Sequence, residues 1–493
     1  MPRASIALAL GAVASVLLLF LSAFLVVDSD LFHEMALARA TLAQGSVPTE
    51  DLFAYTPTVS PSVHHEWGTG MILYGVVAAA GASGLLLLKY GLGFGMFTSL
   101  FHCGRLQKAS WEILCLLAPL AILLADVGFT TVRAQMFSMA FLAALLVMLQ
   151  WDRQGGRKWL FIWLPLYVLW LNLHAGFVVG VVLLGCYWME HWIRDRKPRW
   201  HLLGCAAAMA VLLLANPYGP DYLRYLSGAL LMERPLIQEW QPLWAAPNLA
   251  LLFAFSLAPA LYAWRRDGLR RLPGWLALLI FALAAGRHVR HLSLYAVVWM
   301  ATVPAWLDAT PLGEELRQLW RRNRRVVATL CILVILGGLT GAILHEPWRL
   351  RIPVQEGEDS PVAYPAGAVD YLLEQGFEGN VMTPFIAGSF VIWKLHPGVK
   401  VSLDGRYEVA YRHGVTEQVL DFYAGKAGWR ATLERYPTDL VLVRSDQPVH
   451  ALLQRDPDWL AVYTDDSFLL FARNGNDLPV LHRQELPALV DLR

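Results

Sequence analysis

The sequence predicts a polytopic α-helical membrane protein, with about 11 to 13 transmembrane helices and a C-terminal soluble α/β domain. Of its 493 residues, 56% are hydrophobic and 16% are charged, whereas a soluble protein of this length would be about a quarter charged. Long runs almost without charge recur through the first two thirds, and the last third changes to shorter apolar runs. The net charge of +1 provides no overall basic field for nucleic acid, so none is expected as a partner.

The transmembrane prediction rests on apolar runs of roughly the 20 residues that a helix needs to cross a bilayer. The first run is longer than the apolar core of a signal peptide and is not followed by a small-residue cleavage site, so we expect a retained helix. The eleven candidates lie near residues 5–27, 83–102, 111–126, 133–150, 159–173, 175–192, 201–215, 248–264, 272–287, 291–308 and 325–345.

Basic loops predict the orientation of these spans, because short cytoplasmic loops carry an excess of Lys and Arg. With the N-terminus inside, eleven spans put every basic loop inside, namely 105–108, 152–158, 194–199, 265–271 and 321–325. The prediction is a transmembrane domain over 1–345, with a first outer loop at 28–82, and an outer domain over 346–493. We expect a location in a bacterial cytoplasmic membrane.

One stretch, EWGTGMILYGVVAAAG at 66–81, is apolar but short. Counting it as a span would reverse all later loops against the charge rule. We therefore predict a re-entrant or surface-lying helix.

The last third alternates strand-like and helix-like segments, such as KVSLDGR and TEQVLDFYAG, which is typical of a small α/β domain. All five cysteines lie before this region, and no CxxC pair occurs. The core of this domain is therefore expected to hold without disulfides.

Polar residues collect on the predicted outer face. Asp28 and Asp30 directly follow the first apolar run. Further acids, imidazoles, amides and guanidinium groups come from separate segments, namely His33, His65, Glu66, Arg133, Gln135, Asn172, His174, Asn216, Glu239, Arg287, Arg290 and His291. Five segments thus bring such groups to one membrane face, and we predict that they form a shared site.

Each of these residues also has a structural interpretation. Either aspartate can end a helix in water, His174 can cap a tight turn between helices, and the NPYG at 216–219 is a turn signal. Arginines near 287–290 break the positive-inside trend, however, which favours an anionic partner over a solvated face.

The convergence of these groups suits a lipid-phosphate substrate. A carboxylate can act as a general base on a hydroxyl, while Arg and protonated His can stabilise the charge on a leaving phosphate. No P-loop, G-x-S-x-G or H-E-x-x-H motif occurs, so nucleotide hydrolysis and metalloprotease chemistry have no support.

Several of these stretches resemble one known group. DSDLFHEMALARATLAQGSVPTEDLFAYT followed by HHEWGTGMILY resembles the first outer loop of bacterial membrane proteins in the GT-C glycosyltransferase superfamily. VRAQMFS, WLNLHAGF, NPYG, IQEW, GRHVRH and TPFIAGSFVIWKL…VSLDGRYEV also resemble this group, in the same order. Phe32 stands where the group usually has Trp, and Ala175 where Gly is commoner.

The resemblance implies a GT-C-like fold and transfer from a polyprenyl-phosphate sugar at the outer face, to a glycan, lipid or protein acceptor. The essential acid after the first span maps onto Asp30, or onto Asp28, as the base for inverting attack. Arg133, Arg287 and Arg290 are candidates for binding the donor phosphate. The side chains implied to line the site are His65, Glu66, Asn172 and His174.

Alternatives remain open at this stage. A divalent cation could bind Asp28, Asp30, His33 and Glu66, although their spacing is not diagnostic. A transporter of lipid-linked sugars would place polar groups nearer the bilayer midplane, and a non-catalytic scaffold would use its outer domain to bind an envelope partner. SLDGRYE at 402–408 predicts a strand and turn in which Gly405 has a special φ, with acceptor recognition as the alternative.

Overall fold

The computed structural model describes residues 2–23, 27–128, 131–196, 198–232, 237–355, 362–412, 414–482 and 489–490. The chain forms two compact units. The first comprises Met1–Leu25 and Leu86–Trp348, and the second comprises Val26–Leu85 and Arg349–Arg493. The segment after the first helix therefore folds with the last third of the chain.

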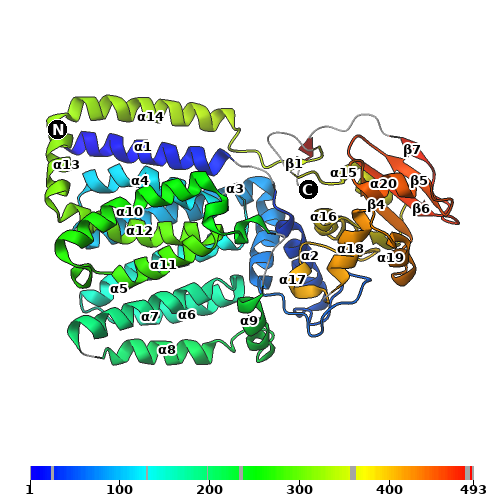
Figure 1. The fold of residues 1–493 in the computed structure, drawn as a ribbon, viewed down its shortest axis with the longest axis horizontal. Coiled ribbons are helices and arrows are strands. Elements are labelled where there is room, and N and C mark those ends of the chain that lie inside the picture. The colour runs from blue at the N-terminus through cyan, green and yellow to red at the C-terminus, as the bar shows by residue number, and fades with distance from the viewer. Residues whose placement is uncertain are drawn as a thin grey trace. The chain divides into compact units, whose positions relative to one another are not determined.

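The first unit is a bundle of apolar helices (Figure 1). Its helices are α1 (Pro2–Ala23), α3 (Trp67–Leu106) from Leu86 onward, α4 (Trp111–Ala125), α5 (Gln135–Arg153), α6 (Trp159–Leu173), α7 (Phe177–Asp195), α8 (Trp200–Leu212), α9 (Asp221–Leu231), α10 (Pro247–Asp267), α11 (Trp275–Arg287), α12 (Leu292–Asp308), α13 (Pro311–Arg322) and α14 (Arg324–Leu344). Short 3₁₀ turns are η1 (Asp126–Gly128), η2 (Gln238–Trp240), η3 (Leu243–Ala245), η4 (Leu269–Arg271) and η5 (Val289–His291).

Each of the eleven predicted spans falls on a helix, although residues 24–26 of the first lie outside the described part. Six described helices are long and apolar enough to cross a membrane, or seven if α12 and α13, bent by 86°, form one span. The helices α6, α8 and α11 have only 15, 13 and 13 residues, shorter than a full span requires. The protein is a multi-pass membrane protein.

Helix α12 is the centre of this bundle, since almost all of its side chains are buried. It packs against α4, α5, α10 and α11, while α1 lies along α14. Two of the predicted cytoplasmic loops meet on one carboxylate, because Asp152 accepts hydrogen bonds from Arg157 at 2.8 Å and from Arg199 at 3.1 Å. The indole of Trp159 and the hydroxyl of Tyr187 also donate to it, so this fully buried acid joins α5, α6 and α7.

The second unit contains the predicted mixed α/β fold. Its main sheet has the order β3-β2-β4-β6-β5-β7, with β2 parallel to β3 and β4, and β6 antiparallel to β4 and β5. The strands are β1 (Ile352–Pro353), β2 (Gly379–Met382), β3 (Val399–Val401), β4 (Leu440–Arg444), β5 (Trp459–Thr464), β6 (Phe468–Arg473), β7 (Leu481–His482) and β8 (Leu489–Val490), of which β1 and β8 pair separately. The helices are α15 (Ala366–Glu374), α16 (Phe385–Leu395), α17 (Tyr407–Ala410), α18 (Val415–Tyr423), α19 (Trp429–Arg435) and α20 (Pro448–Leu453).

The predicted first outer loop is built into this second unit. It begins with α2 (Ser29–Gln44), which packs on α16. The chain then runs beside β3, where Tyr55 N–H donates to Val401 O at 3.1 Å and Val401 N–H donates to Phe53 O at 2.9 Å. Further along, Thr58 forms an antiparallel bridge with Tyr411. The loop therefore extends the edge of the sheet.

The stretch at 66–81 is helical and begins α3, but Gly81 interrupts that helix with φ 61° and ψ −156°. Its first turns lie against α2, because a methyl group added at Gly70 would stand 2.4 Å from the carbonyl oxygen of Glu34. A separate helix up to Gly81 agrees with the sequence pattern, and its relation to the membrane stays a prediction.

Candidate active site

Asp28 and Asp30 have different positions at the start of α2. Asp28 is the N-cap, and its Oδ1 accepts the backbone N–H of Asp30 at 3.1 Å. Such a cap satisfies one of the donors that a helix leaves unpaired at its N-terminus. Asp30 lies in the first turn, where the helix dipole stabilises a carboxylate. The purely structural role, in which an aspartate caps the end of a helix, therefore fits Asp28 better than Asp30.

The SLDGRYE turn of the last third borders Asp30. A methyl group added at Gly405 would lie 3.1 Å from Ser389 Oγ, 3.3 Å from His33 Nδ1 and 3.4 Å from Asp30 Oδ1. Gly405 does not have a positive φ, so the expected special backbone conformation was wrong. Glycine is needed here because three polar side chains approach it closely.

A buried ionic network holds this turn. Arg406 donates to both carboxylate oxygens of Asp404, at 2.9 and 2.6 Å, and to Asp51 at 2.5 Å. Tyr411 OH donates to Asp404 at 2.8 Å, and the Arg406 guanidinium stacks over the Phe53 ring. Arg406 is only 4% exposed. Because a bidentate ion pair fixes geometry, the network locks the 402–411 turn to the loop that carries Asp51.

The two histidines beside this network are neutral at pH 7. Burial lowers the pKa of His33 to about 4, with the Asp404 carboxylate opposing the shift and Arg406 adding to it. Burial and then Arg406 lower the pKa of His64 to about 3. His33 therefore meets a substrate as a neutral imidazole, and not as the cation that phosphate binding would favour.

Glu34 and Glu66 form a second carboxyl pair near Asp30. Glu34 is 3% exposed, and no N–H or O–H group in the described part of the chain donates to either of its oxygens. Burial, and then the close Glu66 carboxyl, raise the pKa of Glu34 well above its ordinary value. A protonated Glu34 can donate to Glu66, whose Oε1 lies 3.2 Å from His65 Nε2.

In the first unit, three of the predicted residues contact Glu239 or Trp240. Arg133 Nη2 pairs with Glu239 Oε1 at 2.5 Å, and the Arg290 guanidinium lies 4.6 Å from the Trp240 ring centre. Trp240 also contacts the ring of His291, at 5.9 Å between centroids. Gln135 Nε2 donates to Ser293 Oγ at 3.2 Å, next to this cluster in α12. A cationic and aromatic patch thus exists within the unit.

The remaining predicted residues of the first unit make local contacts. His174 Nδ1 lies 2.6 Å from Ser138 Oγ and accepts the Gly176 N–H at 3.2 Å. Asn172 Nδ2 donates to Ala215 O, and Asn216 Oδ1 accepts the Tyr218 N–H. Arg287 Nε donates to the ring of its neighbour, His288, at 3.3 Å. These contacts agree with turn and capping roles, and a substrate role for each stays a prediction.

The predicted site residues divide between the two units. Asp28, Asp30, His33, His65 and Glu66 belong to the second unit, and the other nine belong to the first. The shared site stays a prediction. No group of three or more His, Cys, Asp or Glu in the described ranges has a geometry that could hold a metal ion.

Sequence reasoning missed several residues of these clusters. Ser389 is a lone serine in the apolar helix α16, and only its contacts with His33 and with the Gly405 N–H single it out. Lys89 is 1% exposed inside an apolar helix and interacts with the charge of Asp126. A lone lysine in LLLLKYGLGFG was a usable signal, because ionisable residues in spans are costly and often functional.

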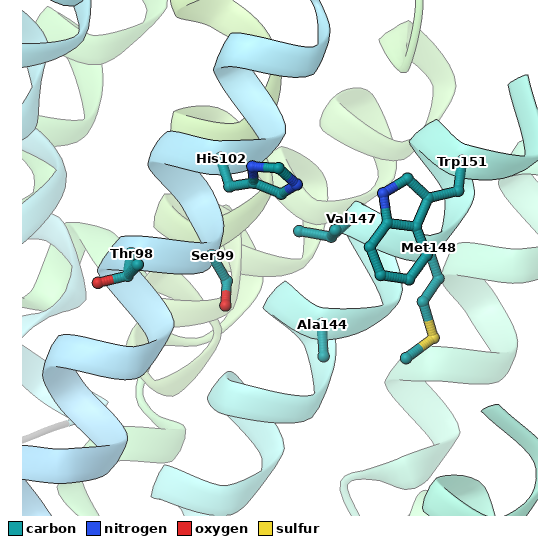
Figure 2. A pocket seen from close by; sticks show the side chains of 7 residues that line it. All are labelled: Thr98, Ser99, His102, Ala144, Val147, Met148 and Trp151. Carbon is teal, nitrogen blue, oxygen red and sulfur yellow. The ribbon is translucent and has the colours of Figure 1, made fainter. Parts of the chain in front are cut away.

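A groove of about 300 Å³ lies between α3 and α5, lined by Thr98, Ser99, His102, Ala144, Val147, Met148 and Trp151. Figure 2 shows the His102 and Trp151 side chains turned into the space between the two helices. None of the predicted site residues lines this groove. It is therefore not part of the candidate active site.

Comparison with known proteins gives a match at the level of structure. No family model and no curated protein matches the sequence. The fold is similar to that of ArnT from Cupriavidus metallidurans, solved bound to undecaprenyl phosphate, with a TM-score of 0.54, 12% identity, and coverage of 95% of this chain and 98% of that one. The chain has the GT-C fold.

A second structure extends this comparison. The arabinofuranosyltransferase AftD from Mycobacteria gives a TM-score of 0.54 and 15% identity, and the match covers 95% of this chain and 42% of that one. At these identities the GT-C likeness concerns the fold. The likeness does not show what this chain binds or which substrate it uses.

Proposed function

We propose that the protein is a membrane glycosyltransferase that moves a sugar from a polyprenyl-phosphate donor to an acceptor at the outer face of the cytoplasmic membrane. The observation that carries the proposal is the position of Asp30 in a GT-C fold. It lies in the first helical turn after the first apolar helix, against a glycine and a neutral histidine.

In this mechanism, Asp30 accepts the proton of the acceptor hydroxyl while that oxygen attacks the anomeric carbon. The bond between the anomeric carbon and the phosphate oxygen breaks, and its electron pair leaves with the lipid phosphate. A positioned general base typically contributes about 10²–10⁴ in rate. Arg133, Arg287 and Arg290 are the proposed ligands of the leaving phosphate, since charge-assisted hydrogen bonds from arginine suit phosphate oxygens.

The test is a transfer assay on the purified protein in lipid nanodiscs. Radiolabelled polyprenyl-phosphate sugars and an envelope acceptor fraction are supplied to the wild type and to the Asp28→Asn, Asp30→Asn and Asp370→Asn variants. We expect Asp30→Asn to lower transfer by about 10²-fold or more. Asn is also a good N-cap, so Asp28→Asn should keep both the fold and most activity. Asp370 is exposed on α15 and is the matched control.

Two results would count against the proposal. Full transfer by Asp30→Asn would remove this acid as the base. A wild-type protein that binds none of the donors would favour a non-catalytic scaffold, in which the second unit binds an envelope partner.

A further inference from the structure

Ser389 links the last third of the chain to the α2 helix. It lies in α16, is fully buried, and its Oγ accepts the backbone N–H of Gly405 at 3.1 Å. The same oxygen lies 3.4 Å from His33 Nδ1, a long hydrogen bond. Within the described part of the chain, these two contacts are the hydrogen bonds that the Ser389 hydroxyl makes, so we infer that His33 Nδ1 accepts its hydrogen.

The tautomer of His33 follows from this contact. A neutral imidazole carries one hydrogen, on either Nδ1 or Nε2. If Nδ1 carried it, Ser389 Oγ would receive two donors and its own buried hydroxyl hydrogen would have no acceptor. A buried donor without an acceptor is destabilising, because the desolvation of the group is not repaid by a hydrogen bond. The hydrogen of His33 therefore belongs on Nε2.

We propose that Ser389 is a positioning residue, which holds His33 in the Nε2–H tautomer beside Asp30 so that His33 serves glycosyl transfer as a neutral hydrogen-bond donor. The role in transfer rests on the proposed function, whereas the tautomer does not. His33 and Asp30 border the same glycine, Gly405, at 3.3 and 3.4 Å from its added methyl group. They are also three residues apart on α2, and so share one face of the helix.

The surroundings of His33 keep this arrangement over a broad pH range. The charged groups that act on it are Asp404, Arg406, Glu66 and Asp28. Burial outweighs the three acids, and the pKa of His33 falls to about 4. Its Nε2–H therefore stays a neutral donor from about pH 5 upward, where Nδ1 continues to accept from Ser389.

The first experiment reads the tautomer directly. The full chain is labelled with ¹⁵N-histidine in nanodiscs, and its multiple-bond ¹⁵N–¹H NMR spectrum is recorded at pH 7, with His33 assigned by the loss of its signals in His33→Gln. We expect the Nε2–H pattern in the wild type and in Ser389→Thr, and a shift toward a tautomer mixture in Ser389→Ala. Ser445→Ala, at an exposed serine of the same unit, is the control. An Nδ1–H or doubly protonated His33 in the wild type would overturn the proposal.

The second experiment measures transfer in the same variants. We expect Ser389→Ala to lower kcat about tenfold, which corresponds to roughly 1.4 kcal/mol, with unchanged donor binding, and Ser389→Thr to restore most of it. Gly405→Ala should also lower kcat, while Gly398→Ala, whose added methyl group makes only ordinary contacts at 3.4 Å or more, should not. Wild-type kcat in Ser389→Ala would refute the positioning role. An absence of transfer in the wild type would instead refute the proposed function, and the NMR result would still decide the tautomer.

Discussion

Glu34 is a residue whose charge state should be visible in the stability of the whole protein. Its pKa is raised above the ordinary value of 4.5, chiefly by burial. The folded protein therefore holds this proton to higher pH than the unfolded chain does, and stability from this group falls as the pH rises above about 4.5.

We expect Glu34→Gln to flatten that fall, since glutamine is neutral at every pH and can donate to Glu66. Unfolding midpoints in nanodiscs between pH 4 and 9 provide the measurement. Glu434→Gln, at an exposed glutamate of α19, should leave the pH dependence of the wild type unchanged. A Glu34→Gln variant that loses stability with rising pH as steeply as the wild type would show that Glu34 is charged.

At the scale of elements, the contact between α2 and the start of α3 depends on one glycine. An added methyl group at Gly70 would lie 2.4 Å from Glu34 O, whereas one at Gly75 would meet nothing within 4 Å. We expect Gly70→Ala to destabilise the second unit by about 1–3 kcal/mol through overpacking. Gly75→Ala should stabilise it by about 0.5–1 kcal/mol through helix propensity. Denaturant unfolding of both variants measures the two changes in the free energy of unfolding, which should have opposite signs. Equal changes would contradict the close contact between Gly70 and Glu34 O.

The elements differ in how well the sequence predicts them. The apolar helices were predictable because each is a continuous run with its own local signal, as in α14. The pairing of residues 53–58 with Val401 and Tyr411 was not, because short isolated bridges have no periodicity of their own. This pairing and the packing of α2 on α16 group residues 26–85 with the last third of the chain, and the expected division near residue 345 did not include that segment.

The candidate site shows the same difference. Asp28, Asp30 and His33 stand out as polar residues at a membrane border. Ser389 and Gly405 do not, because a single serine in an apolar helix and a glycine in a turn are common. Their importance comes from contacts with α2 across more than 350 residues of sequence, which no local pattern encodes.

For the whole molecule, the predicted orientation can be tested by cysteine labelling. Four native cysteines are buried, so in a Cys331→Ser background the remaining native cysteines should not react with the label. Ser445→Cys in the second unit should react with a membrane-impermeant maleimide in intact spheroplasts. Gln154→Cys, exposed in the basic loop after α5, should react only after permeabilisation. The reverse pattern would invert the topology and move the proposed site to the cytoplasmic face.

The long-range pairing of the first loop has a consequence for biogenesis. Thr56 Oγ1 donates to Ser402 O, 346 residues later in the chain. Ribosomes add about 5–20 residues per second. The loop is therefore synthesised roughly 20 to 70 seconds before the segment with which it pairs. During that time its sheet-forming edge is bare, and the nascent chain is most open to proteolysis or to pairing with a neighbouring copy.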